Sequence, residues 1–122
     1  MKPAALLRKG DGSVVAGQAV WACSLWSRTR GMIGRSFARE AFDAMVFEKC
    51  NAVHCCWMSE AVDVLFLDRR WQVVKCCSCV KPWRFAWGGM QAAITVELPA
   101  GTVKRMGIVP GEYLKTELLP ER

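Results

Sequence analysis

The chain lacks several features that mark common classes of protein. No block of five or more like charges occurs, which excludes a solvated basic or acidic tail. Near the start, the apolar run Ala4–Leu7 ends at Arg8 and Lys9, so it is too short for a signal peptide or a membrane span. Phosphate loops, dinucleotide fingerprints and nucleophile elbows are also missing, so no motif names a reaction.

Histidine is represented by one residue, whereas cysteine is abundant. The seven cysteines cannot all pair within the chain, because their number is odd. Adjacent cysteines at 55/56 and 76/77 suit strand positions that face opposite ways better than a disulfide framework. We therefore expect free thiols in a soluble, cytoplasmic protein without membrane contact.

The remaining composition is typical of a small globular protein. With 52% apolar and 23% charged residues disorder is excluded, and residues 1–122 are expected to form a single domain. The net charge of +6 favours anionic partners and would serve solubility equally well. Its main concentration consists of Arg28, Arg30, Arg35 and Arg39.

Apolar residues recur mostly with a period of two, which indicates strands. Many short strands with regular turns predict a mainly β fold, a sandwich or barrel of mostly antiparallel strands. The predicted strands cover residues 4–7, 14–16, 19–23, 42–47, 52–57, 62–67, 72–80, 91–98 and 113–118.

Helical spacing interrupts this pattern once or twice. Residues 25–33 form one predicted helix, with Ser24 as its N-cap and Gly34 as its C-terminal stop. A shorter helix is predicted over residues 102–106, capped by Thr102 and ended by Gly107.

The single histidine lies in a sulfur-rich segment. On a strand, His54, Cys56 and Met58 share one face, and their nitrogen and sulfur atoms would suit a soft metal such as Zn²⁺ or Cu(I). Zinc ligands usually come in pairs from a tight turn, and the chain has no such pair. Core packing of the cysteines is therefore favoured over a metal site.

Asp63 interrupts an apolar run, so its carboxyl group lies either on a wet face or beside donors inside the protein. A bend at residues 59–61 would bring Asp63 near His54, an arrangement that general bases and metal ligands use. No Ser or Cys nucleophile is tied to this pair by a motif, so a buried structural hydrogen bond is the favoured interpretation.

The basic residues allow an anion site or a nucleic-acid surface. Lys81 and Arg84 lie beside Trp83, Phe85 and Trp87, and bases can stack on rings beside cations. Tryptophan at strand positions more often belongs to the core, and no nucleic-acid motif is present. Nucleic acid is therefore disfavoured, and Trp83 is the tryptophan most expected to be exposed.

Four blocks of sequence follow one another along the chain: residues 30–35, residues 54–58 followed by 62–68, residues 80–83, and residues 97–102. In this order they resemble the domain of unknown function 192 family of small bacterial and archaeal proteins. The resemblance spans about residues 19–118 and implies a compact β-rich sandwich or barrel with a short helix, without an established activity.

The resemblance also singles out individual positions. Two positions depart from the family pattern, since Cys55 replaces a typical Thr and Trp71 replaces a typical Gly. Relative to the family pattern, the resemblance implies that the abundance of cysteine is peculiar to this chain. Family positions are matched at Arg30, Gly31, Gly34, Arg35, His54, Met58, Asp63, Pro99 and Gly101.

Three functional hypotheses follow. The first is a non-enzymatic binding or accessory module, without a cofactor, that holds a small anion or a protein partner on a polar patch of Arg30, Arg35, His54, Asp63 and Lys81. The second is a metal-binding or hydrolytic protein that uses His54, Asp63 and Cys56. The third is a nonspecific nucleic-acid binder that uses the basic helix, which is the predicted helix over residues 25–33 with Arg28 and Arg30.

Overall fold

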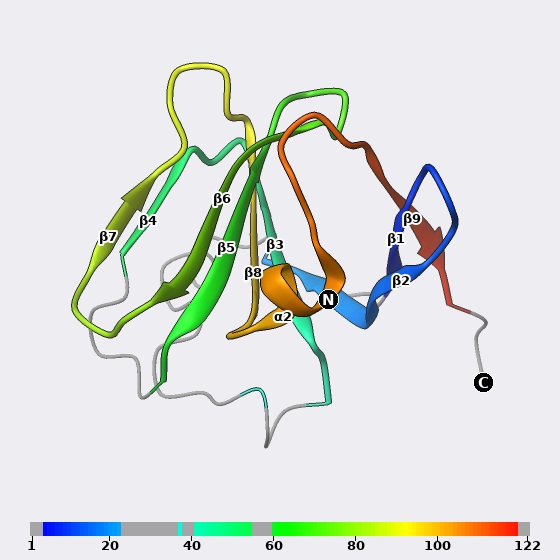
Figure 1. Ribbon diagram of the computed structural model, residues 1–122, viewed down its shortest axis with the longest axis horizontal. Coiled ribbons are helices and arrows are strands. Elements are labelled where there is room, and N and C mark those ends of the chain that lie inside the picture. The colour runs from blue at the N-terminus through cyan, green and yellow to red at the C-terminus, as the bar shows by residue number, and fades with distance from the viewer. Residues whose placement is uncertain (1–3, 23–36, 38–40, 55–59, 120–122) are drawn as a thin grey trace.

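A computed structural model describes residues 4–22, 37, 41–54 and 60–119 (Figure 1). Seven strands form one sheet in the order β6-β5-β8-β3-β2-β1-β9, and β4 pairs with β7 in a separate two-stranded sheet. The elements are β1 (Ala4–Arg8), β2 (Val14–Trp21), β3 (Ala44–Glu48), β4 (Ala52–His54), β5 (Val62–Leu67), β6 (Val73–Val80), β7 (Phe85–Trp87), β8 (Ile94–Pro99), α2 (Thr102–Met106) and β9 (Leu114–Leu118).

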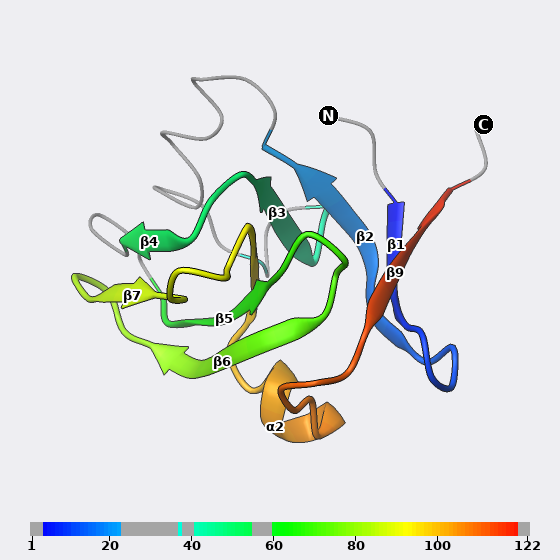
Figure 2. The same ribbon diagram turned by 90° about the horizontal axis from the view of Figure 1, so that it is seen from above.

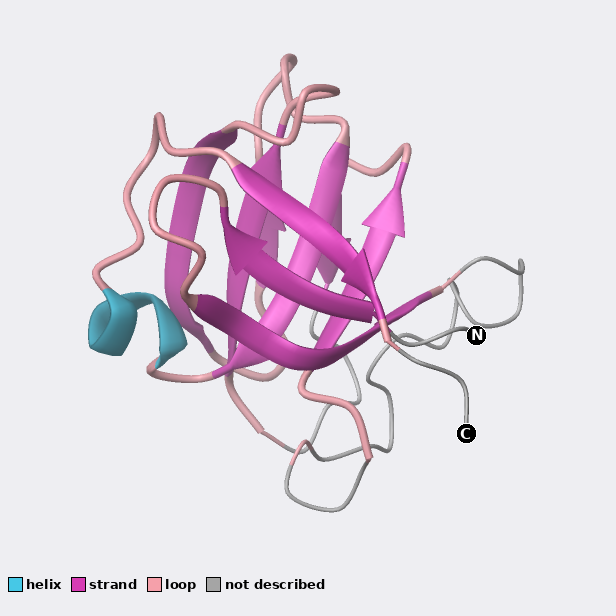
Figure 3. Ribbon diagram, turned by 90° about the vertical axis from the view of Figure 1, so that its right-hand side faces the viewer, coloured by secondary structure: helices cyan, strands magenta, loops and turns pink. Residues whose placement is uncertain are grey.

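The seven-stranded sheet curls into a half-barrel, as seen from above in Figure 2 and from the side in Figure 3. The two edges approach each other where the start of β6 meets the segment before β9. There, Val73 N–H donates to Glu112 O at 2.8 Å, and Leu114 N–H donates to Trp71 O at 3.0 Å. Among the described strands, neighbours are antiparallel except for β2 and β3. The predicted mainly β fold of mostly antiparallel strands is thus confirmed.

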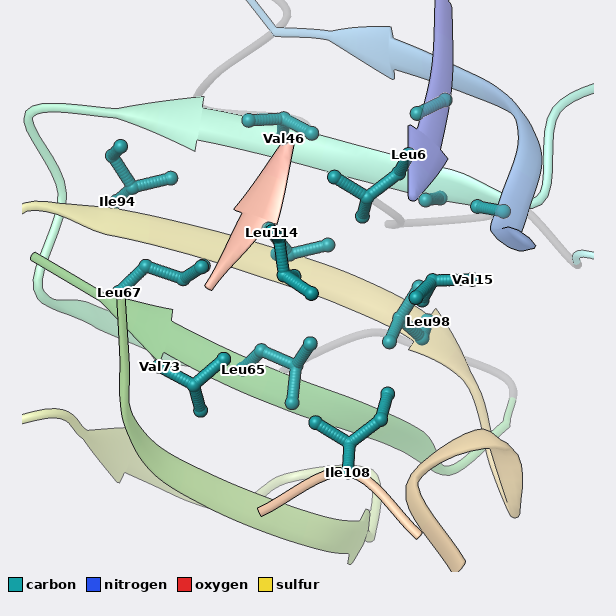
Figure 4. Close-up of a cluster of buried hydrophobic side chains, with 14 of the residues drawn as sticks. Leu6, Val15, Val46, Leu65, Leu67, Val73, Ile94, Leu98, Ile108 and Leu114 are labelled. Carbon is teal, nitrogen blue, oxygen red and sulfur yellow. The ribbon is translucent and has the colours of Figure 1, made fainter. Parts of the chain in front are cut away.

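Side-chain alternation gives the curled sheet two apolar faces. The inner face encloses a core with Leu6, Val46, Leu65 and Leu114, drawn from strands on both sides of the half-barrel (Figure 4). The outer face carries a second cluster, which includes Met45, Val64 and Phe66 of the large sheet and Ala86 of β7. The two-stranded sheet therefore packs on the outer face, while α2 contributes Val103 to the inner core.

One glycine permits the close approach of the small sheet. A Cβ atom on Gly88, directly after β7, would lie 2.3 Å from Cγ of Phe66, far inside van der Waals contact. Gly88 N–H also donates to Asn51 O at 2.8 Å. The absence of a side chain at Gly88 therefore allows the chain at the end of β7 to pack directly against Phe66 of β5.

Local details differ from the sequence predictions. The predicted strands 14–16 and 19–23 belong to one strand, β2. Residues 14, 16 and 19 all pair with β1, and shifts in the register between them allow the strand to continue without a break. The short helix is confirmed, but its N-cap is Gly101 at φ 94°, and Thr102 Oγ1 instead donates to Pro99 O at 2.7 Å.

Trp71 adopts φ 66°, where family members are expected to carry Gly. The predicted helix over residues 25–33 lies outside the described residues.

Arg8 joins three elements through its guanidinium group. Its Nε and Nη2 atoms donate to the two carboxylate oxygens of Glu112, at 2.8 and 3.0 Å. Its Nη1 atom donates to Met106 O at 2.7 Å, which satisfies a carbonyl group at the C-terminal end of α2. One side chain of β1 thereby fixes α2 and the segment that leads into β9.

Replacement of Glu112 by Gln is expected to lower the free energy of unfolding at neutral pH by about 1 kcal/mol or less, since the pair is partly exposed. The hydrogen bond from Arg8 lowers the pKa of Glu112, so its stabilisation is present above the ordinary value of 4.5 and is lost as the pH falls below it. Urea melts at about pH 7 and pH 3 test this. Equal losses at both pH values, or an equal effect of E117Q on exposed β9, would contradict it.

Candidate functional site

Asp63 is fully buried on the inner face of the sheet, and backbone donors occupy both of its oxygens. Oδ1 accepts from Cys79 N–H at 2.8 Å, and Oδ2 accepts from Val103 N–H at 2.8 Å. Cys79 lies at φ 51° beside a bulge in β6, and Val103 lies in the first turn of α2, which has no acidic residue and no side-chain cap of its own. The Asp63 carboxyl group thus anchors both the bulge and the helix start.

This arrangement is the buried structural hydrogen bonding that the sequence analysis favoured for Asp63. The side chain points toward α2, whereas β4, which contains His54, pairs with β7 on the opposite face of the large sheet. The side chain of His54 lies outside the described residues, so its contact with Asp63 stays a prediction.

A second buried carboxyl group, that of Glu97, was not singled out by the sequence analysis. Glu97 is 3% exposed on the outer face of β8, where its strand neighbours are Met45 and Val64. Its Oε2 atom has no hydrogen-bond partner among the described residues, whereas Thr95, two residues earlier, donates to Cys50 O at 2.8 Å. Burial raises the pKa of Glu97 to about 7. The available signal was a single acidic residue within an apolar strand, the same signal that drew attention to Asp63.

Lys81 is exposed in the turn between β6 and β7, next to three exposed aromatic rings. The exposed fractions are 59% for Trp83, 68% for Phe85 and 49% for Trp87. The exposure of Trp83 was predicted, but the assignment of Trp87 to the core was wrong. In β7, Ala86 fills the buried side, so its two aromatic neighbours face outward. We call Lys81, Trp83, Arg84, Phe85 and Trp87 the hairpin surface.

The described cysteines do not form a cluster of ligands. Cys77 packs against the outer apolar cluster, whereas Cys79 is exposed beside the bulge in β6. Burial raises the pKa of Cys76 to about 11, which keeps that thiol protonated. Among the described residues no group of three potential ligands lies close enough to hold a metal ion.

Several predicted residues cannot be placed in this geometry. Arg30, Arg35, Cys56 and Met58 lie outside the described residues, so their roles stay predictions. Within the part of the chain that the structure describes, no helix is long and apolar enough to cross a membrane.

A surface cavity of about 600 Å³ lies beside the turn between β1 and β2 and contains none of the predicted site residues. Its charged groups already have partners. Arg8 binds Glu112, and Lys9 Nζ lies 5.6 Å from the ring centre of Tyr113. The cavity is therefore a weaker candidate site than the hairpin surface.

Replacement of Asp63 by Asn is expected to lower the free energy of unfolding by about 2 kcal/mol, because the amide NH₂ group would face a buried N–H donor. Urea denaturation measures the loss, and hydrogen exchange should accelerate at Cys79 and Val103. Asp43, whose two oxygens accept from Gly17 and Gln18 nearer the surface, supplies a matched control, D43N. A loss no larger in D63N than in D43N would contradict the anchoring role.

Glu97 makes stability depend on pH with the opposite sign to Glu112. Because its folded pKa lies near 7, above the ordinary 4.5, its carboxyl group is accommodated best below pH 4.5, and stability is lost as the pH rises through 7. Between about pH 5 and pH 8 the free energy of unfolding should fall by on the order of 2 kcal/mol more in the parent than in E97Q. Parallel pH profiles of the two proteins in urea melts would refute this.

Comparisons with known proteins identify the family. The profile of the domain of unknown function 192 family, described as uncharacterised, matches residues 7–116. The match begins twelve residues earlier than the resemblance over residues 19–118 that the sequence blocks indicated. A UPF0127 protein of Thermococcus sibiricus is 28% identical over 96% of this chain and 77% of its own length. A UPF0127 protein of Pyrococcus furiosus is 36% identical over 52% of this chain and 54% of its own length.

Two solved structures share the fold. A putative transcription regulator from Sinorhizobium meliloti superposes with a TM-score of 0.79 at 22% identity and covers 95% of this chain and 94% of its own. A protein of unknown function from Novosphingobium aromaticivorans gives a TM-score of 0.73 at 16% identity, over 93% of this chain and 83% of its own. The half-barrel is thus shared with both, and the profile match over most of its length shows that the chain belongs to the domain of unknown function 192 family.

Proposed function

We propose that the protein is a non-enzymatic binding module that holds an anionic ligand or partner segment on the hairpin surface. The observation that carries this proposal is the exposure of three aromatic rings beside Lys81 and Arg84 on β7 and the turn that precedes it. Large exposed apolar groups next to charged groups are typical of interaction surfaces rather than of inert solvent-facing strands.

The charge of this region favours an anionic partner. Between Arg69 and Val96 the chain contains five Lys and Arg residues and no Asp or Glu. Lys75 Nζ donates to Trp87 O at 2.8 Å, so a third cationic group lies at the other end of β7. A partner with negative charge would be attracted to the whole hairpin, and the attraction would weaken with salt.

The polar patch predicted from the sequence relates to this surface in part. Lys81 belongs to it, and the backbone of His54 pairs with Phe85 in the two-stranded sheet. Asp63 serves the backbone instead, through Cys79 and Val103. The metal-binding or hydrolytic alternative gains no support from the described residues and stays a prediction.

The proposal is tested by titrating ¹⁵N-labelled protein with sodium phosphate, a Glu-rich peptide containing one Tyr, and an oligothymidylate of about twelve nucleotides. At least one probe should shift the amide signals of residues 81–88. The double variant K81A/R84A should weaken that binding by about tenfold, the loss of roughly 1.4 kcal/mol.

The variant K104A/R105A removes the same charge from exposed positions on α2 and serves as the control. It should bind like the parent protein. The proposal fails if no probe shifts the hairpin signals, or if the two double variants weaken binding equally.

A further inference from the structure

We infer that the ligand of the hairpin surface is single-stranded nucleic acid, with bases stacked on Phe85 and Trp87 and phosphates held by Lys81 and Arg84. This inference rests on the proposed function and specifies the partner. It uses exposed side chains of the described hairpin rather than the predicted basic helix over residues 25–33.

The spacing of the rings fits planar groups. Phe85 and Trp87 are alternate residues of one strand and face the same side, so their attachment points are about 6.6 Å apart. Carbon atoms in optimal contact are about 3.5 Å apart, so one planar base fits between two rings at this spacing. Trp83, three-fifths exposed in the preceding turn, adds a third ring at the same end as Lys81.

The charges lie where a strand of nucleotides would need them. Lys81 and Arg84 are exposed before the two strand rings, and Lys75 is fixed beyond them by its hydrogen bond to Trp87 O. Each nucleotide supplies one planar base and one phosphate, which matches a row of rings with cations at both ends of β7.

Other anionic partners match only half of this surface. An acidic peptide offers carboxylates but no planar group at every residue, so it would leave the rings in water. A duplex hides the faces of its bases, which stacking on exposed side chains requires. The expectation from sequence that nucleic acid is disfavoured rested on the absence of a nucleic-acid motif and on tryptophan in the core. The second of these grounds does not hold for Trp87, which is half-exposed.

The first measurement compares affinities. Fluorescence anisotropy with labelled oligothymidylate and oligouridylate of about twelve nucleotides is set against a duplex of equal length and the Glu-rich peptide. Single strands should bind at least tenfold more tightly than either. Base stacking on one ring is worth about 5- to 150-fold in affinity, so F85L and W87L should each weaken single-strand binding within that range.

Matched variants separate stacking from charge. The leucine variants keep an apolar side chain and the net charge, and Y113L removes an exposed ring elsewhere without an expected effect on binding. Because Lys81 and Arg84 would each neutralise one phosphate, K81A/R84A should reduce the slope of log K against log salt by about 1.4, whereas K104A/R105A should not. Circular dichroism melts verify that each variant is folded.

The outcomes distinguish this inference from the proposed function. Hairpin binding of the Glu-rich peptide but not of single strands would overturn the inference and leave the proposed function standing. Binding of single strands that F85L and W87L do not weaken would also overturn it, because charge alone would then explain the affinity. Binding of none of the probes would overturn both.

Discussion

The carboxyl group of Asp63 is the interaction on which the rest of the architecture depends. It lies inside the half-barrel and receives one N–H from the β6 bulge and one from the first turn of α2. Burial of such a group is costly unless donors surround it, and here the two donors lie 16 and 40 residues away from Asp63 in the sequence. The bulge in turn sets the direction in which β6 leaves the large sheet and enters the hairpin at Lys81.

The two buried carboxyl groups show how one sequence signal leads to two environments. Asp63 faces the inner side, where a bulge and a helix start present backbone donors. Glu97 lies on a neighbouring strand but faces the outer apolar cluster, where its Oε2 atom finds no donor among the described residues. The face of the sheet therefore decides whether the oxygens of a buried acid meet backbone donors or face an apolar cluster.

Period-two patterning was sufficient to predict the class of fold and the strands of the large sheet, because alternating burial is what each strand of a two-faced sheet requires, but it missed β7. It was insufficient where tertiary structure overrides alternation, as at the bulge that turns Cys79 outward. The exposure of Trp87 depends on β7 forming a small separate sheet, which no local pattern encodes. The orphaned oxygen of Glu97 depends on which backbone groups surround it, and that information is absent from a single strand.

The contact between Gly88 and Phe66 has a consequence for the entropy of binding. After the rings, Gly88 packs against Phe66 of β5. Before the rings, Cys79 N–H donates to Asp63 Oδ1. A segment held at both ends has little conformational freedom left to lose, so the rings are preorganised and the proposed binding need not order a loop. A methyl group at position 88 would therefore loosen the ring pair and weaken the proposed binding without changing any of the side chains assigned to it.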